Sequence, residues 1–322
     1  MKRITSLELA ALCGVSQGTV DRALNNRPGI SEKTRRRILQ AAEENGYVKD
    51  MRASSLVSGK SGLLGLVLFD LRNEFFAQLA TAAEARAREL GYTVLLLLTE
   101  RDLAREQDCI LRLRGMGADG LILCPIGKGQ SYAQWLAGQG LPLATVSNRL
   151  SERFPHVGLD DEAAMAACVR HTAERGYRRL IYVYSAKQQE SSGNIDAQRR
   201  RYEGFLKASS ALPLETVLVT DSGYIDAVCA LLSGSETRTA VLLPSDYQAL
   251  RLLLALRERG IDVPGEVGVV GFDNIAMLRY IRPRPATVGY SIEAIGAGAV
   301  DCVLKNAPAG LVPFEILPGE TL

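Results

Sequence analysis

Residues that commonly bind metals are scarce or scattered in this sequence. Its 322 residues include two histidines, His156 and His171, and neither has a second histidine or a cysteine at metal-ligand spacing. The six cysteines form no CxxC pair, which favours reduced and mostly buried thiols over disulfides or a zinc site. We therefore expect no metal and no other cofactor.

Long hydrophobic runs are also missing. No apolar stretch approaches the roughly 20 residues that span a bilayer. The polar N-terminus opens directly into a predicted helix, unlike a signal peptide. Hydrophobic residues make up 47% and charged residues 23% of the chain, as is typical of globular proteins. We expect a cytoplasmic protein of two or three domains with no membrane partner.

Motifs of the common enzyme classes are absent as well. The chain holds no GxSxG, no HExxH and no GxGxxG after its first predicted strand. Residues 59–61, GKS, do not end a phosphate-binding loop, because Ser54 stands where the earlier glycine should be and a strand follows. The adjacent carboxylates of Asp160 and Asp161 are more typical of a helix cap than of acid–base catalysis. These absences favour a binding protein over an enzyme.

Charge is distributed unevenly along the chain. Residues 1–62 contain 11 lysines and arginines against 6 aspartates and glutamates, a net charge of +5. The remaining residues contain 27 against 30, a net charge of −3. A basic head on a slightly acidic body indicates contact with a polyanion at one end only.

The pattern of residues 5–25 predicts two short helices joined by a tight turn. Thr5 and Glu8 have the spacing of a capping box, and Ser16 is a good cap for the second helix. Gly14 can take the left-handed conformation that turns the chain between them. Apolar residues predict the packing faces: Leu7, Ala10 and Ala11 in the first helix, and Val20, Ala23 and Leu24 in the second.

The outer face of the second helix is polar at its N-terminal end, where it carries Gln17, Gly18, Asp21 and Arg22. This is the helix-turn-helix layout, in which the second helix lies in the DNA major groove. An ordinary helical hairpin is the alternative.

A third helix is expected from Ser31 to about residue 45, and its basic cluster suits either a solvated face or phosphate contacts: Lys33, Arg35, Arg36 and Arg37.

After a polar linker at residues 47–62, strands alternate with helices. Strands are expected at residues 63–69, 92–98, 119–124, 141–146, 180–184, 216–219, 240–243 and 267–272. Helices are expected at 75–90, 103–114, 132–137, 162–175, 197–208, 224–232 and 247–259. This alternation predicts doubly wound parallel sheets, two rather than one, with ligands bound at the carboxyl ends of the strands.

Several motifs, in order over some 270 residues, resemble the LacI/GalR-type transcription regulators. GVSQGTVDRALNNRPGIS at residues 14–31 is similar to the helix-turn-helix signature of that family. Residues 51–56 stand at the place of the hinge helix, and LRNEFF at 71–76 resembles the segment after the first core strand. PGEVGVVGFDN at 264–274 is close to another family motif, and an RxRxxGF pattern agrees at Arg199, Arg201, Gly204 and Phe205.

The resemblance implies an all-α helix-turn-helix head and an α/β core of two doubly wound parallel-sheet subdomains, like that of periplasmic binding proteins. The expected boundaries are 1–46 for the head, 47–62 for the hinge and 63–322 for the effector-binding and dimerisation core. Within the core, one subdomain would hold about 63–160 plus 288–318, and the other about 161–287.

Some residues depart from the family pattern. Asp21 stands where serine is usual, Glu74 where proline is usual, Asn148 where aspartate is frequent, and Ser245 where asparagine is frequent. No leucine-heptad tail follows the core, which argues for a dimer and against a tetramer built by such a tail.

The resemblance also implies which residues bind DNA. Base contacts are expected from Gln17 and Arg22, with Gly18 allowing close approach and Asp21 either accepting from a cytosine amino group or acting as a cap. Phosphate contacts are expected from four polar residues: Thr5, Ser16, Thr19 and Asn25. In the hinge, Ala53 and Leu56 would reach the minor groove, with Leu56 as a wedge that kinks the duplex. The alternative for Leu56 is an anchor of the linker on the core.

A small effector is expected in the cleft of the core. Phe76 would stack on it, and Arg201 and Asp273 would hydrogen-bond it. The remaining candidates from the resemblance are Asn73, Asn148 and Ser245. Phe76 also suits simple core packing, and Asp273 a turn cap. An arginine, an aspartate and one aromatic wall suit a hydroxyl-rich molecule such as a sugar.

These expectations combine into a DNA-binding repressor that acts as a homodimer on palindromic operator half-sites under the control of a carbohydrate effector. One alternative is a solute-binding protein with the same two-lobed core, which would have no use for a basic helix-turn-helix head. The other is an enzyme acting on sugars or nucleosides, which would need a catalytic constellation that we do not find.

Overall fold

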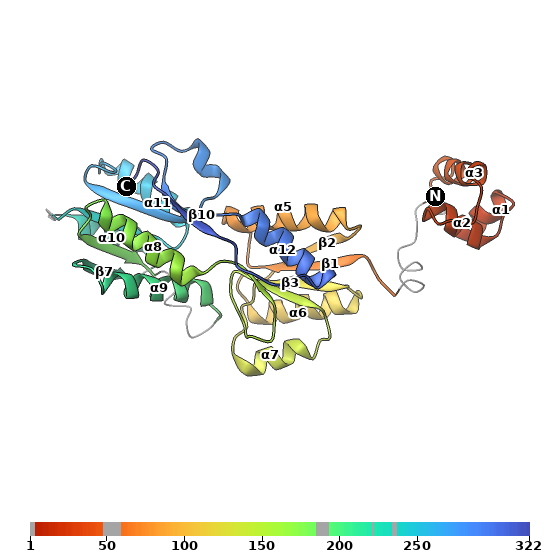
Figure 1. The fold of residues 1–322 in the computed structure, drawn as a ribbon, viewed down its shortest axis with the longest axis horizontal. Coiled ribbons are helices and arrows are strands. Elements are labelled where there is room, and N and C mark those ends of the chain that lie inside the picture. The colour runs from red at the N-terminus through yellow and green to blue at the C-terminus, as the bar shows by residue number, and fades with distance from the viewer. Residues whose placement is uncertain (1–3, 48–58, 185–192, 221, 234–236) are drawn as a thin grey trace. The chain divides into compact units, whose positions relative to one another are not determined.

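The computed structural model describes residues 4–47, 59–184, 193–220, 222–233 and 237–322. The chain divides into two compact units, Met1–Ser61 and Gly62–Leu322, and each is described by itself (Figure 1). We refer to the first unit as the head and to the second as the core. None of the helices in the described part of the chain has the length and apolar character that a membrane crossing requires.

Residues 4–47 of the head form a bundle of three helices, α1 (Ser6–Leu12), α2 (Gln17–Leu24) and α3 (Glu32–Glu44). The predicted capping box is present, since the Thr5 amide donates to Glu8 Oε2 at 2.8 Å and the Glu8 amide donates to Thr5 Oγ1 at 3.2 Å. Gly14 has a φ of +58° and turns the chain between α1 and α2.

A small apolar core holds the three helices together. Its buried residues are Leu9, Ala10, Cys13, Val20, Ala23, Ile38 and Ala42. The expected packing face of the first helix was partly wrong, because Leu7 is 66% exposed and Ala11 is exposed too. In α1 the residues spaced to meet α2 and α3 are Leu9, Ala10 and Cys13.

The first lobe of the core is a five-stranded, fully parallel sheet in the order β2-β1-β3-β4-β5. Its strands are β1 (Leu63–Leu68), β2 (Thr93–Leu98), β3 (Gly120–Leu123), β4 (Leu143–Val146) and β5 (His156–Val157). Its helices are α5 (Glu74–Glu89), α6 (Leu103–Gly115), α7 (Gly129–Ala137) and α12 (Ile292–Lys305).

The second lobe is a six-stranded sheet in the order β11-β10-β9-β8-β6-β7, parallel except where β11 pairs antiparallel with β10. Its strands are β6 (Arg179–Val183), β7 (Glu215–Val219), β8 (Thr239–Leu242), β9 (Val267–Asp273), β10 (Ala286–Tyr290) and β11 (Phe314–Leu317). Its helices are α8 (Asp161–Glu174), α9 (Asp196–Ser209), α10 (Tyr224–Leu232), α11 (Asp246–Glu258) and the 3₁₀ helix η2 (Ala276–Tyr280).

The chain passes between the lobes three times, before α8, between β10 and α12, and between α12 and β11. The three helices of the head and the two sheets of the core confirm the all-α head and the two-sheet α/β core that the sequence predicted. The expected assignment of residues 288–318 to the first subdomain was wrong for the strands, because β10 and β11 hydrogen-bond into the second sheet. Only α12 packs on the first lobe, chiefly against α5.

Candidate functional site

The outer face of α2 presents its polar residues to solvent. Gln17 and Arg22 are both exposed, and Gln17 Nε2 donates to Ser6 Oγ at 2.9 Å. Ser16 Oγ caps the helix by accepting from the Thr19 amide at 3.2 Å. The residues expected to read bases therefore share the exposed face of α2, with Gln17 in its first turn and Arg22 in its last turn. An exposed polar face of this kind is what readout in the major groove requires.

Asp21 already has partners inside the head. Its carboxylate forms an ion pair with Arg27 at 2.9 Å and accepts a hydrogen bond from Asn25 Nδ2 at 2.6 Å. The negative charge that departs from the family pattern is thus neutralised locally. Asn25 Nδ2 also donates to the Asp21 carbonyl, so the Asn25 side chain caps the C-terminal end of α2.

Two members of the basic cluster on α3 donate hydrogen bonds to backbone carbonyls near the C-terminal ends of α1 and α2. Arg35 donates to the carbonyls of Arg22, Ala23 and Arg27 at 3.1, 3.3 and 2.7 Å. Arg37 donates to the Cys13 carbonyl at 3.0 Å. The carbonyls of Cys13, Arg22 and Ala23 lie at the C-terminal ends of α1 and α2, where the regular pattern of helical hydrogen bonds ends, and Arg27 lies in the loop after α2. The other two cluster residues, Lys33 and Arg36, are exposed. The hinge residues Ala53 and Leu56 lie outside the described residues.

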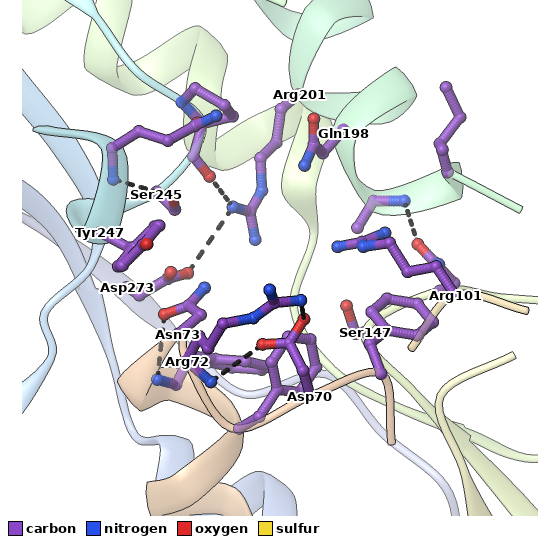
Figure 2. A pocket seen from close by; sticks show the side chains of 18 of the residues that line it. Asp70, Arg72, Asn73, Arg101, Ser147, Gln198, Arg201, Ser245, Tyr247 and Asp273 are labelled. Atoms are coloured by element: carbon purple, nitrogen blue, oxygen red, sulfur yellow. Dashed lines mark hydrogen bonds and ion pairs between the residues drawn. The ribbon is translucent and has the colours of Figure 1, made fainter. Parts of the chain in front are cut away.

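A cavity of about 380 Å³ lies in the core at the carboxyl ends of the strands (Figure 2). All six residues expected to bind the effector line it: Asn73, Phe76, Asn148, Arg201, Ser245 and Asp273. They come from both lobes, with Asn73, Phe76 and Asn148 on the first and the others on the second. We refer to this cavity as the cleft. Its volume is at the small end of the range of about 300–1,000 Å³ for small-molecule sites.

Arg201 organises one wall of the cleft. Its Nε donates to Asp161 Oδ1 at 2.7 Å, and its Nη1 donates to the Pro244 carbonyl and lies 3.6 Å from Asp273 Oδ1. The guanidinium also stacks over the Phe272 ring, 3.6 Å from its centroid. Burial lowers the pKa of Arg201, but the carboxylates outweigh burial and the pKa lies above its usual value. Arg201 therefore stays charged and fixed in position.

Asp273 ends β9 beside Arg201 with a φ of 117°, a left-handed conformation that is rare for aspartate. Its Oδ1 accepts a hydrogen bond from the Tyr290 hydroxyl at 2.6 Å. Complete burial raises the pKa of Asp273 to about 7, and the Arg201 charge opposes that rise. A carboxyl group that titrates near neutral pH can offer a ligand either an acceptor or a donor.

The other expected ligand residues are partly engaged in holding the fold. Asn73 caps α5 by accepting from the Phe75 amide at 3.2 Å, and Ser245 caps α11 by accepting from the Gln248 amide at 3.4 Å. Phe76 is 6% exposed and packs edge-on against Phe69 and Phe75. Phe76 thus both packs in the hydrophobic core and lines the cleft.

Asn148 links the two lobes through both ends of its carboxamide. Its Nδ2 donates to the carbonyls of Pro125 and Asn194 at 3.3 and 2.8 Å, and its Oδ1 accepts from the Ala197 amide at 3.1 Å. Because these contacts use its polar atoms within the protein, Asn148 acts here as a joint between the first lobe and α9.

Sequence reasoning missed several polar residues of the cleft: Asp70, Arg72, Arg101, Ser147, Asn194, Gln198, Ser222, Tyr224, Tyr247, Gln248 and Arg251. Asp70 and Arg101 follow β1 and β2, so the rule that ligands bind at strand ends pointed to their neighbourhood. Gln198 lies one turn before Arg201 and Arg251 lies six residues after Ser245, but both are on helices whose facing surfaces the sequence alone did not define.

Two family descriptions match the chain. Bacterial regulatory proteins of the lacI family match residues 7–50, and a periplasmic binding protein-like domain matches residues 169–311. The transcriptional regulator MalR of Streptomyces coelicolor is 31% identical over 331 residues, which cover 97% of this chain and 93% of MalR.

Solved structures show the same fold. The Lac repressor dimer bound to operator and the anti-inducer ONPF aligns over 99% of both chains with a TM-score of 0.83 and 22% identity. The complex of the transcriptional regulator CelR with cellobiose aligns over 99% of this chain and 100% of CelR with a TM-score of 0.68 and 22% identity.

A helical head with an exposed reading helix, joined to a two-lobed core, defines a DNA-binding transcriptional regulator and not an enzyme. Its relatives are regulators of the same kind over nearly the whole length of the chain. The chain belongs to the lacI family of bacterial regulatory proteins.

Proposed function

We propose that the protein is a repressor that binds palindromic operator half-sites as a homodimer and changes its operator affinity when a small hydroxyl-rich metabolite, such as a sugar, occupies the cleft. The arrangement of Arg201 and Asp273 on one wall of the cleft, opposite Phe76, carries this proposal. The charged pair offers donors and an acceptor to hydroxyl groups, and the aromatic ring suits the apolar face of a sugar ring.

Gln198 supports a ligand that donates hydrogen bonds. Its side chain lines the cleft near Arg201, and its Oε1 is buried with no hydrogen-bond partner among the described residues (Figure 2). A buried acceptor without a donor costs about 1–3 kcal/mol. Turning of the Gln198 amide toward the cleft would let a ligand hydroxyl donate to this oxygen and remove the cost, which favours a polyhydroxylated ligand over an apolar one.

For DNA, the proposal assigns base contacts to Gln17 and Arg22 and phosphate contacts to Thr5, Ser16 and Thr19. Exposure of Gln17 in the first turn and of Arg22 in the last turn of α2 supports the first assignment. Asp21 keeps its ion pair with Arg27 in this proposal, so it orients Arg27 and Asn25 at the end of the reading helix instead of accepting from a cytosine.

The solved relatives are consistent with both halves of the proposal. The Lac repressor was seen as a dimer bound to operator, and CelR was seen with cellobiose. Those properties belong to those proteins, and here they support only the choice of a dimer and of a carbohydrate as the hypotheses to test.

Selection of bound duplexes from a random DNA library tests the DNA half. We expect an inverted repeat from the full-length protein. We also expect Arg22→Ala to lose about 1–3 kcal/mol of discrimination at one base position in each half-site while retaining non-specific binding. Arg36→Ala, which removes an exposed charge from α3 instead, serves as the control that keeps the base preference. An unchanged preference in Arg22→Ala would contradict the assignment.

The effector half is tested by titrating sugars against the complex with the selected operator. Arg201→Gln and Gln198→Met should lose the response to the active sugar and still bind operator, because both changes lie in the core. Circular dichroism of each variant checks that the core still folds. Wild-type response in both variants would remove the cleft from the proposal.

A further inference from the structure

The cleft carries more positive charge than a neutral sugar requires. Its described lining includes four arginines, Arg72, Arg101, Arg201 and Arg251, against two aspartates, Asp70 and Asp273. If all six are ionised, the lining has an excess of two positive charges. Neutral hydroxyl groups need balanced donors and acceptors, whereas an excess of guanidinium groups is typical of sites for phosphate or carboxylate.

The excess does not come from Arg201. Asp161 lies 2.7 Å from its Nε and Asp273 lies 3.6 Å from its Nη1, so its charge is compensated by one carboxylate outside the lining and one within it. The remaining three arginines provide the positive surface. Of these, Arg72 and Arg101 belong to the first lobe, and Arg251 belongs to α11 of the second.

Arg72 is held toward the cleft by its own neighbour. Its backbone amide donates to Asp70 Oδ1 at 2.9 Å, and its Nη2 donates to Asp70 Oδ2 at 3.1 Å. Asp70 thereby orients the guanidinium, while the Arg72 side chain remains 76% exposed and can bind further acceptors. Figure 2 shows this guanidinium directed into the cleft from the side of Asp70 and Asn73.

Arg101 reaches the same space from the end of β2. Glu100 and Arg101 both have left-handed backbone conformations, with φ values of 51° and 61°, which cost energy in non-glycine residues. The guanidinium then lies over the Phe69 ring, 4.2 Å from its centroid, and points into the cleft (Figure 2). The strained turn and the aromatic platform fix this cation at the wall opposite Arg201.

Arg251 completes the set from the other lobe. It is exposed, and its guanidinium lies 5.9 Å from the centroid of the Tyr224 ring, which also lines the cleft. Cations on both faces of an empty cleft repel each other, and an anion between them attracts both faces. Binding of an anion would therefore favour closure of the lobes.

We propose that the effector is an anionic carbohydrate, whose phosphate or carboxylate group is held by Arg72 and Arg101 with Arg251 approaching from the second lobe, while Arg201, Asp273 and Gln198 bind its hydroxyls. This inference rests on the proposed function, in which the cleft takes a hydroxyl-rich ligand. It adds the charge of that ligand.

Matched pairs of sugars test the charge directly on the full-length protein by isothermal titration calorimetry. Glucose is compared with glucose 6-phosphate and glucuronate, and galactose with galactose 1-phosphate and galacturonate. Ribose is compared with ribose 5-phosphate alone. At least one charged member should bind about tenfold or more tightly than its neutral partner, because charge-assisted hydrogen bonds are about twice as strong as neutral ones. The phosphate and acid arms identify which anion is preferred.

Variants separate the cleft from other cationic surfaces of the protein. Arg72→Gln and Arg251→Gln should each weaken binding of the charged sugar about tenfold and leave the neutral partner unaffected. Arg112→Gln is the matched control, because Arg112 is an exposed arginine of the first lobe that pairs with Asp108 on α6, outside the cleft lining. Inorganic phosphate alone is titrated against the wild type and Arg72→Gln. Binding that Arg72→Gln weakens belongs to the cleft, and binding that it leaves unchanged is adventitious binding elsewhere, such as on the basic head.

The outcomes distinguish this inference from the proposed function. If neutral sugars bind as tightly as their charged partners, or if Arg72→Gln binds the charged sugar as the wild type does, the inference is wrong and the proposed function stands. If no sugar of either kind binds and none alters the operator complex, the inference is wrong and the effector half of the proposed function falls with it.

Discussion

At the scale of single residues, burial shifts the pKa values of two carboxyl groups in the second lobe, and one of them lines the cleft. Burial raises the pKa of Asp273 to about 7 and that of Asp246 to about 6. Asp246 accepts from Thr287 Oγ1 at 2.7 Å and from the Ile275 amide at 3.1 Å, so it joins α11 to the segment that follows β9. Asp273 faces the cleft itself and is therefore the more informative of the two.

The raised pKa of Asp273 predicts that the protein without ligand loses stability as pH rises. In the unfolded chain the group titrates near 3.8 and in the folded chain near 7, so the folded state binds more protons between these values. Its contribution to stability therefore falls from about pH 4 to about pH 7, and the full cost is present above pH 7.

Asp273→Asn removes this titration and should flatten the dependence. We expect the drop in melting temperature between pH 5 and pH 8 to be smaller in the variant by a few °C, since 1 kcal/mol corresponds to about 2–4 °C in a domain of this size. Scanning calorimetry without ligand measures it. Asp226→Asn, which changes an exposed aspartate of α10, should keep the wild-type slope. Parallel curves for Asp273→Asn and wild type would contradict the prediction.

At the scale of helices and strands, the sequence predicted best where the signal is local. Ser16 and Ser31 accept hydrogen bonds from the amides of Thr19 and Thr34, three residues further on, so the starts of α2 and α3 could be read directly from the sequence. The contacts of Arg35 span 8 to 13 residues. No periodicity reveals such contacts, and the basic cluster therefore left two interpretations open.

Arg35 should matter for the stability of the head more than its neighbour does. Arg35→Ala removes hydrogen bonds to three carbonyls at and beyond the end of α2, and a cation near that helix end is also favourable. We expect a loss of about 1–3 kcal/mol. Arg36→Ala removes the same charge from an exposed side chain and should leave stability nearly unchanged.

Hydrogen exchange of peptides from α2 and α3 in the full-length protein measures this difference. Arg35→Ala should exchange faster in both helices, and Arg36→Ala should exchange as the wild type does. Equal exchange in the two variants would mean that Arg35, like Arg36, acts only as a surface charge.

The candidate site was predictable only in part, because several of its residues come from segments that are distant in the sequence. Arg201 and Asp273 stand in sequence motifs that resemble a family, and both line the cleft. Arg101 and Arg251 stand in no motif, and Arg72 stands in the LRNEFF motif without an expected ligand role. The three line one cleft because β1 and β2 are adjacent in one sheet and α11 belongs to the other lobe. Pairing between distant strands decides which side chains meet.

At the scale of the whole core, the three passages between the lobes explain the boundary that was predicted wrongly. Residues 286–317 form a strand, a helix and a strand, and nothing local in their sequence says that the helix packs on one lobe and both strands on the other. Near one end of the cleft the lobes are joined by buried bonds, in which Asn194 donates to the Ile126 carbonyl at 2.7 Å and accepts from Asn148 Nδ2 at 2.8 Å.

A separate contact joins the lobes through Glu74, the residue that replaces the usual proline of the family. Its Oε2 accepts a hydrogen bond from the Met277 amide at 3.1 Å, so the first turn of α5 in the first lobe holds η2 of the second. This contact is exposed, whereas the contacts of Asn148 and Asn194 are buried. We therefore expect the Glu74 contact to break first when the lobes separate.

Glu74→Ala should thus favour separation of the lobes without unfolding either one. The Met277 amide should exchange about 2- to 10-fold faster, as the loss of one hydrogen bond worth about 0.5–1.5 kcal/mol implies. Glu74→Gln keeps an acceptor oxygen and should restore most of the protection. Glu84→Ala, which changes an exposed residue of the same helix that pairs with Arg88, is the control. Hydrogen exchange of peptides covering η2 decides it: if Glu74→Ala and Glu84→Ala exchange alike there, Glu74 does not hold the lobes together.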